Sequence, residues 1–314
     1  MRHVTRDDDL GAGDAADLTS ADRTRADRMP SPEVFVRIET AYADSLDTLH
    51  NRLARIRFKA PPFDNQDDAL RTMYAQVAYT VLSNGRAVLA LSRSGDAEQM
   101  GAHVRPMFEG TVRGQYIHKI RPTRVSDFFD IVPFEQMRDI SDYSRRNDFV
   151  AAIAARCLDV LRARPNLLDD IEGVTDPSGI LAGTIKPPYA LLRKKLEFPD
   201  VASILRSLGR HDPGWKFDLY PTIYRHTSAT IHGGVHFTTH RIAPGEVADL
   251  FRFDLEPRMS YAYALLMQGE AYILGASATL ETAFALADPP CTPLMPAFEE
   301  HQRNEAVLRE GNYL

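Results

Sequence analysis

Apolar side chains recur every three or four positions along much of this chain. An α-helix turns about 100° per residue, so this spacing places the apolar side chains on one face of a helix. Residues 33–58 show the pattern plainly, with Val34, Ile38, Tyr42 and Leu46 in step. The other segments predicted to be helical are residues 67–91, 96–120, 127–137, 148–164, 189–208, 257–287 and 296–309. No regular alternation of strands with helices accompanies them, so the sequence predicts an all-α helical bundle.

The chain is predicted to consist of a tail and one domain. Residues 1–30 are rich in Asp, Arg, Ala and Thr and hold few large apolar side chains, so we expect them to be disordered. Residues 31–314 are predicted to form a single helical domain. Within it, the polar residues 92–95 join two long helices, which predicts an antiparallel hairpin. Glycines and prolines in residues 170–188 predict a long loop or lid.

Charge and composition limit where the protein works and what it binds. The formal net charge is −6, so no overall attraction draws the chain to nucleic acid, and any RNA contact has to be local. No uncharged apolar run approaches the roughly 20 residues of a membrane span, and the N-terminus lacks the apolar core of a secretory signal. Two cysteines far apart, Cys157 and Cys291, suit a reducing compartment. We therefore expect a cytoplasmic location without membrane contact.

One polar stretch near the middle of the second half carries the strongest chemical signal. Residues 224–234 read Tyr-Arg-His-Thr-Ser-Ala-Thr-Ile-His-Gly-Gly. In a helix, Arg225, Ser228 and His232 would share one stripe. The two glycines that follow are predicted to end that helix, which places His232 in the last turn, where the helix dipole favours a protonated imidazole. Such a stripe could grip and attack a phosphodiester, or it could form a buried polar cluster.

A second polar pair lies upstream. Arg105 and Glu109 are four residues apart, which is the spacing of an ion pair on one helix face. Either side chain could instead reach across to Arg225 or His232, because a charged group buried in a bundle needs a partner. Pro106 leaves one backbone carbonyl of the same predicted helix without its usual donor, and the resulting distortion could open a pocket or simply be a kink.

These stretches resemble the HEPN superfamily of helical-bundle proteins and, within it, a bacterial domain family of unknown function. The resemblance covers about residues 65–290. The family patterns are an Arg-x-x-x-Glu helix and a Tyr-x-x-x-Tyr-Arg-x-x-Ser-x-x-x-His-Gly signature. The matching residues are Val104-Arg105-Pro106-Met107-Phe108-Glu109, Phe198-Pro199-Asp200, Tyr220, Tyr224, Arg225, Ser228 and His232-Gly233.

The resemblance implies a HEPN-like bundle and a metal-independent ribonuclease without a cofactor. It implies that His232 moves a proton from the RNA 2′-hydroxyl and that Arg225 stabilises charge on the phosphate, which suits imidazole and guanidinium chemistry. HEPN nucleases usually form their site where two copies meet, so a homodimer is implied, as is a setting in toxin or phage-defence systems. The residues expected to support the two catalytic groups are Tyr224, His226, Ser228, Arg105 and Glu109.

Two alternatives remain open for the same residues. The motif could form a structural hydrogen-bonded cluster with Glu109 in a non-catalytic binding or scaffold domain. His232, His236 and His240 also stand at four-residue steps and could hold zinc or iron if one helix continued through them. The two glycines favour a break at that point, so no metal is expected.

A run of basic residues near the end of the helix predicted at 96–120 offers a second contact surface: Arg113, His118, Lys119, Arg121 and Arg124, with Tyr116 interleaved. Such a run can follow a phosphate backbone, with the tyrosine ring available for stacking. The residues expected to bind substrate are therefore Arg113, Lys119, Arg121 and Arg124. The alternative is an ordinary solvated helix face.

Overall fold

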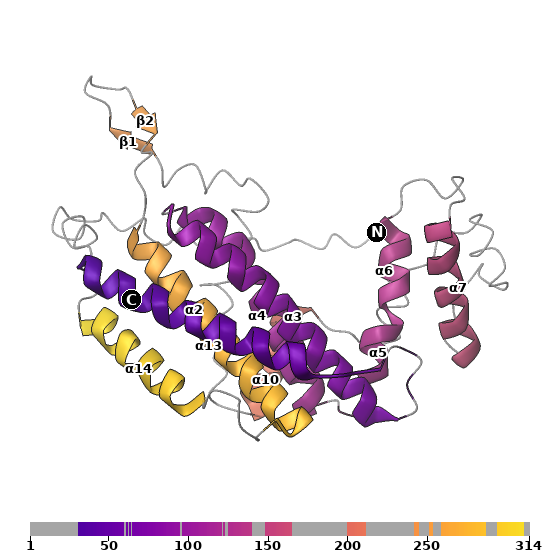
Figure 1. The fold of residues 1–314 in the computed structure, drawn as a ribbon. Coiled ribbons are helices and arrows are strands. Elements are labelled where there is room, and N and C mark those ends of the chain that lie inside the picture. Colours follow the sequence, from indigo (N-terminus) through magenta and orange to yellow (C-terminus); the bar gives the residue numbers. More distant parts are fainter. Residues whose placement is uncertain are drawn as a thin grey trace.

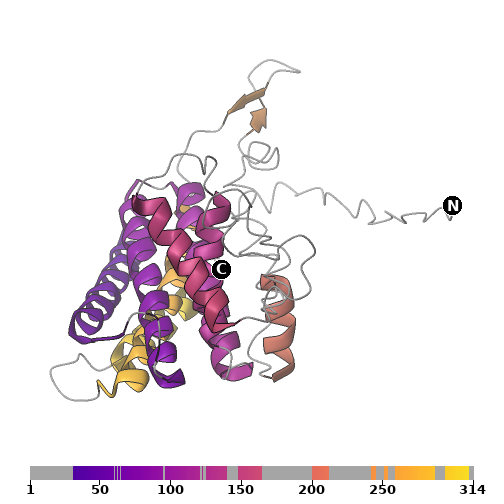
Figure 2. The same ribbon diagram turned by 90° about the vertical axis from the view of Figure 1, so that its right-hand side faces the viewer.

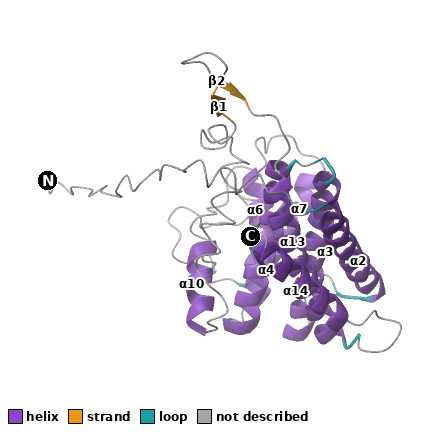
Figure 3. Cartoon of the chain, turned by 90° about the vertical axis from the view of Figure 1, so that its left-hand side faces the viewer, coloured by secondary structure: helices purple, strands orange, loops and turns teal. Residues whose placement is uncertain are grey.

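The computed structural model of the chain describes residues 31–59, 61, 63, 65–94, 96–120, 122, 125–139, 148–164, 200–211, 242–244, 251–253, 259–286 and 294–310. Within these ranges the chain is almost entirely helical (Figure 3), which confirms the predicted all-α class. One two-stranded antiparallel hairpin is an exception, in which β1 (Ile242–Pro244) pairs with β2 (Phe251–Phe253). The predicted tail at 1–30, the predicted loop at 170–188 and the segment 224–234 lie outside the described residues.

Four long helices form the centre of the fold (Figure 1): α2 (Pro32–Arg55), α3 (Gln66–Ser92), α4 (Ala97–Ile120) and α13 (Met259–Phe284). Each coincides with a predicted helix to within a few residues at either end. Helix α13 packs against all three others, so the segment with the most apolar sequence lies between them. None of the helices in the described ranges has both the length and the apolar composition that a bilayer span requires.

Side-chain contacts fix the relative direction of α3 and α4. Asn84 Oδ1 lies 3.1 Å from His103 Nδ1, close to the connection between the two helices. Near their other ends, Tyr74 Oη hydrogen-bonds His118 Nδ1. Residue numbers therefore fall along α3 as they rise along α4, and the predicted antiparallel hairpin is confirmed.

Helices α2 and α13 run parallel to each other. The rings of Phe35 and Tyr263 pack edge to face with centroids 5.3 Å apart. Further along both helices, Ser45 Oγ donates to Glu270 Oε1 at 3.3 Å. Because residue numbers rise together along the two helices, α2 and α13 lie side by side and point in the same direction.

Two glycines allow the helices to approach one buried tyrosine. Tyr42 on α2 is fully buried, and a Cβ built on Gly269 of α13 would lie 2.9 Å from its hydroxyl oxygen. A Cβ on Gly85 of α3 would lie 3.3 Å from the same oxygen. Burial raises the pKa of Tyr42 above its ordinary value, and the nearby Glu270 carboxylate adds to the effect. The phenol has no hydrogen-bond partner among the described residues, so its role is to fill the core.

Side-chain caps set where two of the helices begin. Asn65 caps α3, because its Oδ1 accepts a hydrogen bond from the backbone N–H of Asp68 at 2.9 Å. Helix α10 (Val201–His211) begins in the same way, with Asp200 Oδ1 accepting from the backbone N–H of Ser203 at 2.7 Å. The prediction of one helix over 189–208 is wrong at Asp200, because α10 begins at Val201, and residues 189–199 lie outside the described residues.

The other helices surround the bundle: α5 (Val125–Asp130), α6 (Val132–Asp139), α7 (Asp148–Ala163) and α14 (Leu294–Glu310). Helix α14 packs against α13 and α2, whereas α10 packs against α4 (Figure 2). Helices α6 and α7 pack against each other and stand apart from the four long helices in Figure 1. Arg164, just after α7, bridges back to Asp130 of α5 at 2.8 Å.

Two prolines act differently from one another. The prediction of a single helix at 127–137 is wrong, because the chain forms two helices there, α5 and α6, with a break between them. Pro133 lies in the first turn of α6, where no backbone donor is needed. Pro106 instead lies inside α4, which continues through it. Its neighbours Met107 and Phe108 are fully buried, so packing on the bundle offsets the lost backbone hydrogen bond.

Candidate functional site

The described residues hold one part of the predicted site. The following predicted residues lie outside them: Tyr224, Arg225, His226, Ser228, His232, His236, His240, Arg121 and Arg124. The predicted residues that the structure does describe are Arg105, Glu109, Arg113 and Lys119. All four belong to α4, so this helix is where the candidate site can be examined.

On α4, two arginines hold one glutamate. Arg105 Nε donates to Glu109 Oε1 at 2.8 Å, and Arg113 Nη2 lies 3.6 Å from Glu109 Oε2. Arg105, Glu109 and Arg113, here called the charged row, follow one another at four-residue steps along one helix face. Their side chains are 15%, 22% and 33% exposed, so the row is partly shielded from water. Of the arrangements that the sequence left open for Arg105 and Glu109, the pair within one helix is present.

The charged row faces away from two of the neighbours of α4. Helix α4 meets α3 through His103 and Gly114, and it meets α13 through Phe108. With a rotation of about 100° per residue, the centre of the row lies roughly 120–140° from His103 and Gly114 and about 100° from Phe108. Helix α10 also packs against α4, and the sequence after α10 leads into the motif at 224–234. Lys119 is exposed near the C-terminal end of α4.

A pocket of about 310 Å³ opens on another side of α4, between α3, α4 and α13. Helix α3 contributes Tyr74, α4 contributes Thr111 and Gln115, and α13 contributes Tyr272 and Gly275. None of the side chains that line it is charged. The pocket was not predicted, because it depends on how three helices distant in sequence meet.

Some of the polar groups around this pocket have hydrogen-bond partners among the described residues, and others have none. Tyr272 Oη accepts a hydrogen bond from Gln268 Nε2 at 2.9 Å, and burial raises the pKa of Tyr272 despite that hydrogen bond. Burial also raises the pKa of Tyr74, to about 12. The Gln115 carboxamide makes no hydrogen bond within the described residues, and Thr111 Oγ1 is buried there without a partner. The pocket therefore holds unused hydrogen-bonding capacity beside aromatic surface.

A buried carboxylate lies where α2, α13 and α14 meet. Glu270 is 1% exposed, and it accepts a hydrogen bond from Ser45 Oγ at 3.3 Å. His301 Nδ1 lies 2.7 Å from the second carboxylate oxygen, with 14% of the His301 side chain exposed. The carboxylate thereby fixes the orientation of the imidazole. This cluster was not predicted, although a glutamate inside the apolar stretch 257–287 was a signal for it.

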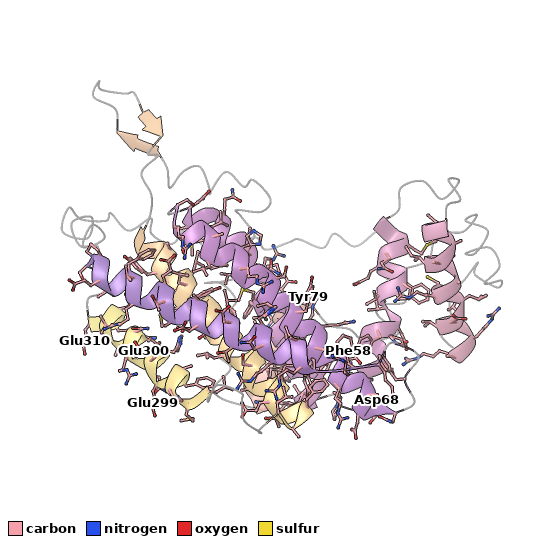
Figure 4. All side chains as sticks on the ribbon, viewed as in Figure 1. Phe58, Asp68, Tyr79, Glu299, Glu300 and Glu310 are labelled. Carbon is pink, nitrogen blue, oxygen red and sulfur yellow. The ribbon has the colours of Figure 1, made fainter. Side chains whose placement is uncertain are left out.

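Other polar side chains join the same helices. Arg37 Nε on α2 donates to Asn304 Oδ1 on α14 at 2.8 Å and lies 3.8 Å from Glu300 Oε1. Figure 4 labels Glu300 on α14, below α2. Arg52, whose side chain is 2% exposed, bridges to Glu281 of α13 at 3.1 Å. Because these groups are paired between helices, we assign them to the stability of the bundle and not to a site.

The charged row and the pocket are thus the candidate sites within the described residues. In those residues, no three His, Cys, Asp or Glu side chains gather closely enough to hold a metal ion. The metal-binding alternative rested on His232, His236 and His240, which lie outside them. Comparison of the chain with protein-family models, with curated proteins and with solved structures finds no match.

Proposed function

We propose that this chain is a metal-independent ribonuclease of the HEPN type, with Arg225 and His232 as its catalytic residues. The resemblance of the sequence to that superfamily is the starting point. Tyr224, Ser228 and the pair on α4 would support the two catalytic groups. In this proposal two copies of the chain form the working site together, as the resemblance implies.

The pairing of Arg105 with Glu109 carries the proposal. These two residues are the fixed positions of the Arg-x-x-x-Glu pattern, and they lie within the described residues. They are joined at 2.8 Å and partly shielded from water, as expected for residues that support a site and not for a pair on an open surface. The all-α bundle is a second point of support, because it is the fold class that the resemblance implies.

Local charge favours a phosphate ligand on this side of the protein. The chain as a whole carries a formal net charge of −6, which repels nucleic acid. Two of the three side chains in the charged row are arginines, so the row brings two guanidinium groups to one face of α4. Arg113 and Lys119, both predicted to bind substrate, lie on this helix, and in this proposal they contact the phosphates of the RNA backbone.

The proposed reaction is an internal transfer at phosphorus. His232 takes the proton from a 2′-hydroxyl, and the freed oxygen forms a bond to the adjacent phosphorus. The bond from phosphorus to the 5′-oxygen of the next nucleotide breaks, and that oxygen takes up a proton from water. Arg225 stabilises the charge that builds on the other phosphate oxygens. The products are a 2′,3′-cyclic phosphate and a 5′-hydroxyl.

The test compares wild-type protein, His232→Ala and a matched control, His50→Ala, on single-stranded and structured RNA in EDTA. His50 is an exposed residue of α2 that contacts Arg86 at 2.9 Å, far in sequence from the motif. Wild type and His50→Ala should cleave, whereas His232→Ala should lose cleavage by a factor of about 10² or more at an unchanged melting temperature.

Other outcomes would redirect the proposal. Absence of cleavage by wild type, with a large fall in the melting temperature of His232→Ala, would make the motif a structural cluster and the chain a binding or scaffold domain. Cleavage that EDTA abolishes would favour the metal-binding alternative at His232, His236 and His240.

A further inference from the structure

The pocket between α3, α4 and α13 is separate from the charged row and from the proposed ribonuclease chemistry. Its volume of about 310 Å³ lies at the lower end of the roughly 300–1,000 Å³ usual for small-molecule sites. It is built from three of the four long helices, so its walls are held by the core of the bundle. It therefore suits a small ligand.

The side chains that line the pocket disfavour a charged ligand. No acidic or basic side chain lines the pocket, and a charged ligand would lose its hydration there without gaining a counter-charge. Two tyrosines, Tyr74 on α3 and Tyr272 on α13, supply aromatic surface. Gly114 and Gly275 present bare backbone, and a Cβ on Gly275 would meet no atom within 4 Å. A flat ring can come close to such surfaces.

Polar groups in the pocket favour a ligand that has hydrogen-bonding groups along one edge. Gln115 offers a carboxamide that makes no hydrogen bond within the described residues. Tyr272 Oη accepts from Gln268, and among the described residues its own O–H has no acceptor, so it can donate to a ligand. A ligand with both a donor and an acceptor on one edge would satisfy these groups, whereas a purely aliphatic molecule would leave them unpaired.

We propose that this pocket binds a neutral aromatic molecule that carries a hydrogen-bonding group, with its ring against Tyr74 and Tyr272 and its polar group toward Gln115. This site is independent of the proposed ribonuclease activity. Binding would stabilise the junction of α3, α4 and α13, because the ligand contacts all three helices.

The experiment uses the full chain and N-phenyl-1-naphthylamine, a neutral aromatic probe that fluoresces more strongly when it leaves water. The matched comparison probe is 1-anilinonaphthalene-8-sulfonate, which has the same ring system and a negative charge. Gly275→Leu and Ala271→Leu both place a larger side chain at the pocket, and Gln115→Leu removes its amide. Gln99→Leu is the control, because it makes the same change at an exposed position of α4.

We expect one saturable site for the neutral probe on wild type and on Gln99→Leu. Gly275→Leu and Ala271→Leu should each weaken binding at least about tenfold, and Gln115→Leu should weaken it by a smaller factor. The sulfonated probe should neither bind nor compete at the same concentrations. Absence of saturable binding to wild type would overturn the proposal. So would equal binding to a folded blocking variant, checked by circular dichroism, or displacement of the neutral probe by the sulfonated one.

Discussion

Two glycines on the same helix should respond in opposite ways to the same substitution. Gly269 and Gly275 both lie inside α13, so replacing either one with alanine favours the helical state by about 0.5–1 kcal/mol. At Gly275 the added Cβ would meet no atom within 4 Å, and the helical gain should appear undiminished. At Gly269 the added Cβ would lie 2.9 Å from Tyr42 Oη and 3.1 Å from Tyr42 Cε2.

The size of the difference in stability between the two variants depends on how little Tyr42 can move. The Tyr42 side chain is fully buried. Gly85 of α3 is also close, because a Cβ built on it would lie 3.3 Å from the Tyr42 hydroxyl oxygen. Overpacking a core in this way typically costs about 1–3 kcal/mol. Because the helical term is common to both variants, the difference between them is this overpacking cost. Gly275→Ala should therefore be more stable than Gly269→Ala by about 1–3 kcal/mol.

Urea unfolding followed by far-ultraviolet circular dichroism measures this difference directly. Gly275→Ala should have a higher midpoint than wild type, and Gly269→Ala a lower one, with the same slope for all three proteins. Equal midpoints for the two variants, or a higher midpoint for Gly269→Ala than for Gly275→Ala, would refute the packing described around Tyr42.

Three further predictions concern single side chains. His301→Ala should lower the free energy of unfolding by about 2–4 kcal/mol, because Glu270 would stay buried with less compensation, and a loss below about 0.5 kcal/mol in urea unfolding would contradict this. Burial raises the pKa of the Cys157 thiol to about 12, so in Cys291→Ser protein a disulfide reagent should label it only when urea is added, and prompt labelling in buffer would argue against its burial. Burial raises the pKa of Tyr74 from 10.0 to about 12, so its contribution to stability is complete below pH 10 and is lost as the pH rises through about 12. In alkaline unfolding, Tyr74→Phe should therefore lose less stability than wild type over that interval, and equal losses would count against the raised pKa.

The helices could be predicted from the sequence because their signals are local. The apolar spacing of residues 33–58 and 67–91 requires only the geometry of one helix, and the short polar connection at 92–95 requires only that the next helix turn back. The contact of Tyr74 with His118 confirms that turn. Pro133 is a local signal as well, because proline is unfavourable inside a helix. It therefore predicts the break between α5 and α6.

The interior of the bundle could not be predicted in the same way. The burial of Glu270 depends on Ser45 and His301, which come from helices far away in the sequence. The pocket likewise depends on the distance between α4 and α13 at Gly114 and Gly275, which no local pattern encodes. Within the candidate site, the Arg105–Glu109 pair was predictable, since its four-residue spacing is a property of α4 alone.

The central claim is that Arg225 and His232 cleave RNA by using its own 2′-hydroxyl. The most direct measurement incubates the protein in EDTA with two oligonucleotides of the same sequence, one of RNA and one of 2′-deoxy nucleotides. Cleavage of each is measured, and the ends of the products are then identified. The account predicts cleavage of the RNA alone, with a 2′,3′-cyclic phosphate on the new end and a 5′-hydroxyl on the other. Cleavage of both oligonucleotides, or RNA ends that carry a 5′-phosphate, would contradict it.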